Sequence, residues 1–152
     1  MLPHSVWVHT DGRVFVCDRE NDRVQIFSPS GEVLAIWTNT TRPGDLFIDQ
    51  QNRVYLGEMA WVPEETRLTG RPYPEARAAQ LSVRDLDGNV LARWGGPDPC
   101  APGSFASPHG LTLDSRGDLY VGEVTHTALS RGGRWHPGCH SLQKFVRRPG
   151  PL

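Results

Sequence analysis

Two histidines of this chain have the type and spacing that favour metal chemistry. His4 and His109 each follow a proline that opens an apolar run, and Gly44 holds the same place in a third run. Imidazole is a common metal ligand near neutral pH, and three imidazoles with one open position are typical of catalytic zinc. His4 and His109 would supply two ligands of such a site. The alternative is that each imidazole caps its strand by hydrogen bonding to the backbone.

Arg19 is the candidate catalytic residue, and it stands in the charged stretch 18–23. A guanidinium matches a substrate carboxylate with two parallel hydrogen bonds. The alternative is that Arg19 only pairs with the acids beside it. Asp18, Glu58 and Glu123 recur at one position of a repeat, which predicts a structural role in accepting backbone N–H bonds from the following loop.

An internal repeat must position these residues. Segments that open at Pro3, Pro43 and Pro108 share one pattern of apolar runs and turn residues. Four short antiparallel strands in about 40–45 residues are typical of a β-propeller blade. We therefore predict an all-β fold, almost without helix, with three blades at about 2–37, 38–94 and 95–148 and a tail at 149–152. The third blade lacks its outer strand, because residues 147–151 (RRPGP) are poor strand formers.

The connections between these strands differ in length according to the face on which they lie. Five connections are tight turns: 10–12, 28–31, 49–52, 86–89 and 114–117. Three are long: 59–79, 95–107 and 124–140. In a blade, all three long connections fall on one face of the ring, which is also the face where the innermost strands begin. Functional loops gather in this way on a rigid scaffold, although tolerated insertion is the alternative.

Composition narrows the class of protein. The formal net charge of −1 argues against nucleic acid and membrane surfaces as partners. Three cysteines without CxxC spacing predict no zinc knuckle and no disulfide framework, although Cys100 and Cys139 lie in long loops of one face and could approach one another. His126, His136 and His140 share no known metal spacing, so solvent exposure is expected. No secretory signal is visible at the start, and the compartment is left open.

The segments 3–27 and 108–124 resemble NHL repeats. The stretches PHS…CDRENDR and PHG…LYVGEVTHT are also similar to the lyase domain of peptidylglycine α-amidating enzymes and its bacterial relatives. The resemblance implies a six-bladed propeller whose central zinc is held by three histidines. It also implies cleavage of peptidyl-α-hydroxyglycine into a peptide amide and glyoxylate. On this resemblance His4 and His109 match two zinc ligands, and Arg19 matches an arginine implicated in catalysis.

The chain departs from the lyase pattern in ways that limit this interpretation. The third histidine and the catalytic tyrosine belong to blades absent here. Gly110 replaces an aspartate tied to activity and to a structural calcium, which argues against calcium. We therefore expect lyase-like activity only in a completed ring. The remaining blades or a second copy of the chain would complete it, and the chain alone would dimerise or behave poorly. The alternative function is a non-catalytic scaffold that binds a protein, peptide or glycan through its long loops.

Overall fold

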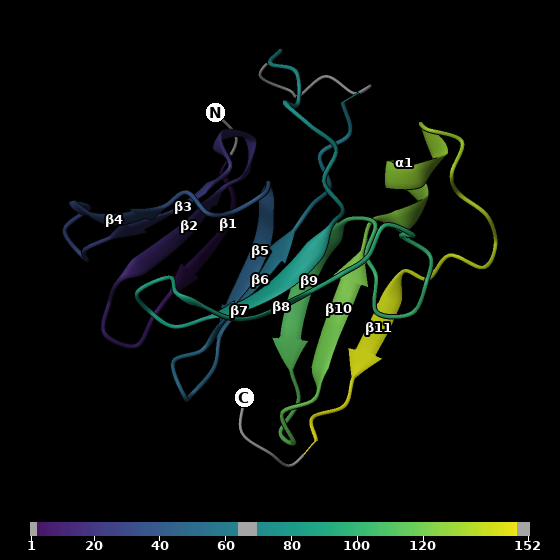
Figure 1. Cartoon of the computed structure of the whole chain (residues 1–152). Coiled ribbons are helices and arrows are strands. Elements are labelled where there is room, and N and C mark those ends of the chain that lie inside the picture. Colours follow the sequence, from purple (N-terminus) through teal and green to yellow (C-terminus); the bar gives the residue numbers. More distant parts are fainter. Residues whose placement is uncertain (1–2, 64–69, 149–152) are drawn as a thin grey trace.

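The computed structural model describes residues 3–63 and 70–148, which form three antiparallel sheets, here called blades 1 to 3 (Figure 1). Blade 1 contains β1 (Pro3–Val8), β2 (Val14–Asp18), β3 (Arg23–Phe27) and β4 (Val33–Trp37). Blade 2 contains β5 (Pro43–Ile48), β6 (Val54–Glu58), β7 (Gln80–Arg84) and β8 (Val90–Trp94). Blade 3 contains β9 (Pro108–Leu113), β10 (Leu119–Glu123) and β11 (Leu142–Phe145). The helical segments are η1 (Arg19–Asn21) and α1 (Thr125–Ser130).

The strand period of two gives the middle blade two buried faces. In β6, Val54 and Leu56 pack into a core between blades 1 and 2, whereas Tyr55 packs into a core between blades 2 and 3. The first core is completed by Phe15, Cys17, Val24, Ile26, Trp37, Leu46 and Ile48. The second is completed by Ala79, Leu81, Val83, Phe105, Leu111, Leu119 and Val121. Blade-on-blade packing is thus the main source of apolar burial.

A proline meets a glycine where blades 2 and 3 join. A Cβ on Gly57 would lie 3.0 Å from the Cβ of Pro108, so the joint needs glycine there. Gly122 holds the same place in blade 3, where a Cβ would meet only the Gly110 carbonyl, at 3.9 Å. Pro3, the equivalent of Pro108, is exposed on blade 1.

Blade 1 turns an apolar sheet face away from blade 2. Val6 and Val8 of β1 are 63% and 64% exposed, and further apolar side chains of β4 are also exposed. A monomer rarely leaves such a face uncovered. The expectation that other blades or a second copy cover it stays a prediction.

The all-β propeller fold predicted from the repeat is confirmed. Blade 3 has three strands within the described residues, as expected from the poor strand-forming residues near the end. The short helix α1 and the single turn η1 are additions that the sequence pattern did not predict. The tail 149–152 lies outside the described residues, so the predicted domain limits stay a prediction. No helix in the described part of the chain is long and apolar enough to cross a membrane.

Tight turns close the hairpins on one face. Gly12, Gly31, Gly88 and Gly117 have φ near +80° to +90°, and Asn52 has φ +61°, which is the left-handed backbone that these turns require. The opposite face carries the long connections and α1 (Figure 1). We call these the turn face and the loop face.

Candidate functional site on the loop face

The two predicted zinc ligands meet on the inner strands. The ring centroids of His4 and His109 lie 4.9 Å apart, with planes at 77°. The strand register explains the meeting, because each histidine is the unpaired residue of a β-bulge at the start of its strand. Bulges redirect a side chain and are common beside functional sites. Gly44 is the unpaired residue at the equivalent bulge of blade 2.

Blade 2 has no room for a third histidine at this position. A Cβ on Gly44 would lie 2.6 Å from Cε of Met59 and 2.7 Å from the Pro108 carbonyl oxygen. The Gly44 carbonyl instead accepts a hydrogen bond from Nδ1 of His4, at 2.5 Å. Glycine at this position therefore both makes room for Met59 and holds the neighbouring histidine.

Hydrogen bonds through Nδ1 fix both imidazoles. Nδ1 of His109 lies 3.0 Å from the Ser107 carbonyl oxygen, which can only accept, so the proton sits on Nδ1. The same argument holds for His4 on Gly44. Among the described residues, Nε2 of neither ring has a hydrogen-bond partner. A backbone carbonyl on one ring nitrogen is the usual support of a metal-bound histidine.

The protonation state of His109 also suits a metal ligand. Burial lowers the pKa of His109, and the nearby His4, Arg19 and Arg42 lower it further, against the opposing Ser107 hydrogen bond. The imidazole is therefore neutral at pH 7 with its Nε2 lone pair available. The donor set thus fits zinc, with His4 and His109 as two ligands and at least one further ligand needed.

Arg19 and the partly buried Arg42 form a pair around one buried acid. Nε of Arg19 donates to Oε1 of Glu20 at 2.8 Å, and Nη2 of Arg42 donates to the same oxygen at 3.2 Å. Glu20 is fully buried. Burial alone would raise its pKa, but Arg42 and Arg19 outweigh that effect, so the pKa lies below its usual value. One buried carboxylate therefore orients two guanidinium groups.

The backbone at Arg42 is strained. Its φ is +40°, which is rare for a residue with a side chain, and Pro43 follows it. Asp22 holds this conformation, since its Oδ1 accepts the Arg42 N–H at 2.9 Å. The Ala60 carbonyl accepts Nη1 at 3.3 Å. Among the described residues, no acceptor reaches the buried Nε of Arg42. Strain that surrounding contacts maintain in this way is typical of functional positions.

These groups line one pocket of about 900 Å³ on the loop face. Arg19, Arg42 and His109 contribute polar groups to it. The rest of the wall comes from the three long connections and combines apolar or aromatic side chains with further arginines. The former include Met59, Trp61, Tyr73, Pro97, Pro99, Phe105 and Leu129, and the latter are Arg77, Arg131 and Arg134. An apolar cavity with a few convergent polar groups is the usual form of a small-ligand site.

The recurring acids are structural, but their partners differ from the prediction. Glu58 accepts the Thr41 N–H at 2.7 Å, and Glu123 accepts the Ala106 N–H at 2.7 Å. Both donors lie in the connection that precedes the blade, not in the following loop. Asp18 accepts side-chain bonds from Asn21 and Arg23 instead. Glu58 and Glu123 therefore fix blades 2 and 3 to the connections that enter them.

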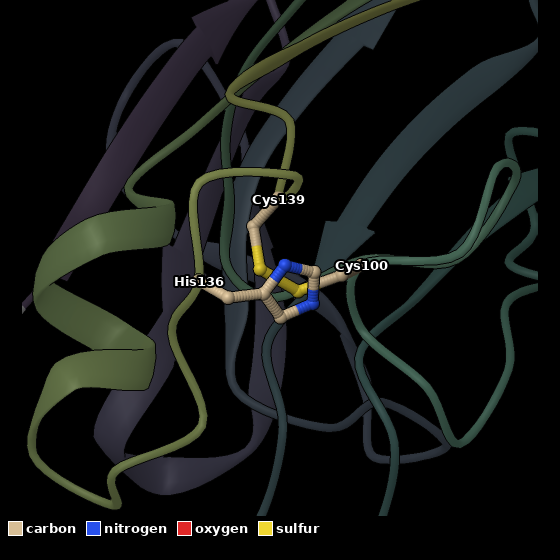
Figure 2. A group of neighbouring side chains, drawn as sticks. All are labelled: Cys100, His136 and Cys139. Carbon is tan, nitrogen blue, oxygen red and sulfur yellow. A yellow bond between two sulfur atoms is a disulfide. The ribbon is translucent and has the colours of Figure 1, made fainter.

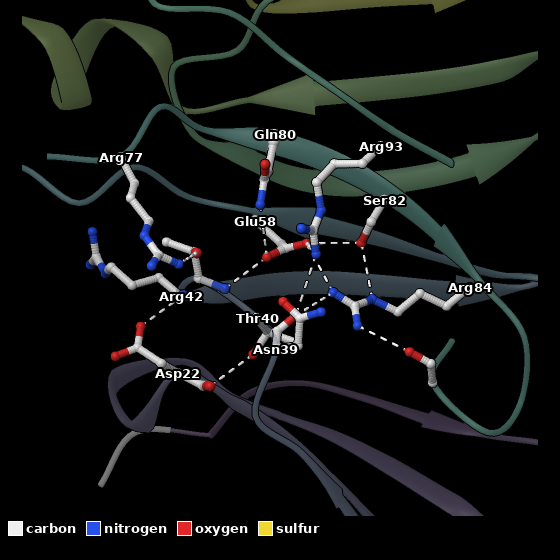
Figure 3. Close-up of polar contacts among 12 residues, drawn as sticks. Asp22, Asn39, Thr40, Arg42, Glu58, Arg77, Gln80, Ser82, Arg84 and Arg93 are labelled. Atoms are coloured by element: carbon white, nitrogen blue, oxygen red, sulfur yellow. Dashed lines mark hydrogen bonds and ion pairs between the residues drawn. The ribbon is translucent and has the colours of Figure 1, made fainter. Parts of the chain in front are cut away.

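Glu58 is the centre of the largest network (Figure 3). Oε1 accepts Ser82 Oγ at 2.8 Å and Nη2 of the fully buried Arg84 at 3.3 Å. Oε2 also accepts Nε2 of Gln80 at 3.2 Å. These bonds compensate the burial of the carboxylate, and they lie beneath the loop face rather than in the pocket.

The sequence left open whether Cys100 and Cys139 are bridged, and the structure answers that question. Cys100 and Cys139 form a disulfide that joins the β8–β9 connection to the β10–β11 connection. His136 lies beside the sulfur atoms (Figure 2), and the three side chains place their ligand atoms within 4.8 Å of one another. Because the two sulfur atoms are bonded to each other, they are not thiolate ligands in this state. The bridge tethers two walls of the pocket.

The remaining histidines have ordinary contacts. His126 stacks edge-on against Trp135 at 4.8 Å. His140 lies 3.3 Å from Oε1 of Glu123. His126 and His136 are exposed, as predicted, and His140 is partly buried. Sequence reasoning missed Glu20 and Arg42, although the place of Arg42, directly before the proline that opens a repeat, was an available signal.

Comparisons with known proteins identify the repeat. Residues 1–27 match the NHL repeat family model. Residues 1–27 of this propeller segment therefore carry an NHL repeat. The chain is 29% identical over 147 residues to NHL repeat-containing protein 3 of Mus musculus, an alignment that covers 89% of the chain and 36% of that relative. This chain thus spans about a third of the length of that relative.

Solved structures agree on the fold. A Bacteroides caccae protein of unknown function superposes with a TM-score of 0.63 at 14% identity, covering 91% of this chain and 43% of that one. Virginiamycin B lyase from Staphylococcus aureus superposes with a TM-score of 0.54 at 15% identity, covering 97% of this chain and 42% of that one. At these identities the likeness supports the propeller fold alone.

Proposed function

We propose that this chain contributes the loop-rich face of a six-bladed, zinc-dependent lyase-like site. His4 and His109 would hold the metal through Nε2, and the third ligand would come from outside the described residues. The meeting of two imidazoles, each with Nδ1 fixed by a backbone carbonyl, carries the proposal. The remaining blades or a second copy of the chain would complete the ring.

The arginine pair supports a substrate that bears a carboxylate. Arg19 and Arg42 share the single buried carboxylate of Glu20. The two guanidinium groups would therefore also bind the carboxylate of a substrate. The expected substrate is a peptidyl-α-hydroxyglycine or a related compound. Its carboxylate would bind the guanidinium groups and thereby place the hydroxylated carbon beside the histidine pair.

The expected reaction is redox-neutral. The bond between the amide nitrogen and the hydroxylated carbon breaks, the hydroxyl loses its proton, and the nitrogen gains one. The products are a peptide amide and glyoxylate. Bound zinc would polarise the substrate hydroxyl. The arginines would orient the carboxylate and offset its charge, and the apolar pocket wall would exclude water.

A binding scaffold is the second candidate. The pocket combines apolar walls with basic groups whether or not a metal is present, which favours a peptide or protein ligand. In that case the histidine pair would only cap the inner strands. The two functions differ in their response to a chelator.

Glyoxylate release from a peptidyl-α-hydroxyglycine by the completed ring distinguishes them. We expect activity that EDTA removes and zinc restores, with a fall of about 100-fold or more in His109→Ala and Arg19→Ala. Arg116→Ala on the turn face is the matched control and should retain full activity. Absence of glyoxylate release by the zinc-loaded ring would reject the lyase and favour the scaffold.

A further inference from the structure

The pocket is strongly basic in a chain whose net charge is −1. Among the described residues that line it there are five arginines and no aspartate or glutamate. The arginines come from four different connections: Arg19, Arg42, Arg77, Arg131 and Arg134. Independent loops thus direct one sign of charge into one hollow, which concentrates the field there.

The outer arginines differ from the inner pair. Arg19 and Arg42 bond to buried Glu20, whereas Arg131 and Arg134 are exposed and form no ion pair within the described part of the chain. Arg77 pairs with Glu75, which is itself 57% exposed. The three outer arginines, Arg77, Arg131 and Arg134, can therefore bind an anionic ligand with a small desolvation cost.

The segment that carries Arg131 and Arg134 is anchored. Leu129 of α1 is buried, and Thr125 donates from Oγ1 to the His140 carbonyl at 2.6 Å. Cys139, further along the same connection, is bridged to Cys100. This anchoring limits the conformational entropy that a ligand must overcome to order the two arginines.

Aromatic rings lie among the arginines. The guanidinium of Arg77 lies 4.3 Å from the Trp61 ring centroid, and that of Arg42 lies 5.3 Å from the Tyr73 ring centroid. Stacking holds each guanidinium flat and leaves its edges for hydrogen bonds. Alternating apolar and cationic surface of this kind suits a peptide that carries both aliphatic and acidic side chains.

We propose that the outer arginines form a subsite for an acidic peptide segment, in which Arg77, Arg131 and Arg134 bind side-chain carboxylates. Planar carboxylates match the arginine forks, and a pocket of about 900 Å³ holds a few residues rather than a folded nucleic acid. The subsite extends the pocket proposed above but needs no metal, so it stands independently of the lyase reaction.

Fluorescence anisotropy in EDTA tests the subsite without the metal. The probes are a labelled hexapeptide of alternating leucine and glutamate and its leucine–glutamine counterpart, titrated with the protein at low and moderate salt. We expect the acidic peptide to bind about tenfold or more tightly than the amide peptide, with affinity that falls as salt rises. Equal binding of the two peptides would overturn the proposal.

Matched variants locate the binding. Arg131→Ala combined with Arg134→Ala should weaken the acidic peptide about tenfold and leave the amide peptide unchanged. Arg116→Ala, which removes an exposed arginine from the turn face, should change neither. Circular dichroism checks that all variants are folded. Unchanged binding in the folded double variant, or displacement of the peptide only by polyphosphate, would overturn the assignment to an acidic peptide.

Discussion

The turn face and the loop face of this molecule use arginine in different ways. On the turn face three arginines each pair with an aspartate of their own hairpin: Arg13–Asp11 at 2.8 Å, Arg53–Asp49 at 2.7 Å and Arg116–Asp114 at 3.2 Å. Against the opposing effect of burial, backbone N–H bonds from Asp118 and Arg116 and the Arg116 side chain lower the pKa of Asp114 to about 2. Hydrogen bonds from Arg13 and His9 lower the pKa of Asp11. Each of these three arginine charges is therefore compensated within its own hairpin.

On the loop face the arginines have few acids of their own. Arg19 and Arg42 share Glu20, and Arg131 and Arg134 form no ion pair among the described residues. These four arginines line one pocket. The same residue type is therefore structural where the hairpin supplies its counter-ion and available for ligands where long connections do not. The two faces therefore differ in whether the hairpin supplies a counter-ion for its arginines, and not in how many arginines they contain.

Glu58→Gln gives the largest expected effect and shows what supports the loop face. Removal of the carboxylate charge leaves the fully buried Arg84 without its counter-ion, which should cost about 3–5 kcal/mol in the free energy of unfolding. Urea denaturation measures it, with exposed Glu32→Gln as control. A loss no greater than that of the control would show that the network in Figure 3 contributes little.

Cys100→Ser tests whether the loop face depends on a covalent tether that the turn face lacks. The bridge closes a sequence separation of 39 residues, so its loss should cost about 2–4 kcal/mol and weaken binding in the pocket. Thermal unfolding and peptide anisotropy measure both effects. A reductant should reproduce them in the unmodified protein and do nothing further to the variant. Unaltered peptide affinity would mean that the bridge is not needed for the pocket.

The pH dependence of stability gives the smallest expected effect and sharpens the comparison at His109. Burial lowers the pKa of the His109 imidazole below its ordinary value of 6.5, so the unfolded chain takes up the proton first as pH falls. Stability should therefore be unaffected by His109 above pH 6.5 and should fall below it. Urea denaturation of His109→Gln should show a weaker acid loss than the unmodified protein. Equal acid losses would contradict the burial of His109.

The repeat pattern was enough to predict the blades, the two faces and the shared place of His4 and His109. The equivalent positions of the three blades could be matched within this one sequence, because the same strand pattern and turn residues recur in each repeat. The sequence did not reveal the bulges that redirect the two rings, since a bulge depends on pairing across strands. It also did not reveal that Glu20 joins Arg19 to Arg42.

Other features that the sequence left open or predicted incorrectly also depend on contacts between strands and blades. The Cys100–Cys139 bridge joins loops whose approach depends on how blades 2 and 3 pack. The partners of Glu58 and Glu123 lie in the connection before the blade, although local capping rules favour the residues that follow. Short-range patterns thus predicted the framework, whereas contacts between blades determined the chemistry of the site.

Zinc titration of the completed ring by calorimetry tests most directly the claim that the loop face holds a histidine metal site. We predict that the ring binds zinc tightly at pH 7.5 and that this binding is lost in His4→Ala and in His109→Ala. His126→Ala, an exposed imidazole on the same face that stacks only on Trp135, should bind as the unmodified ring does. Absence of zinc binding by the folded ring, or binding unchanged in His4→Ala and His109→Ala, would contradict the account.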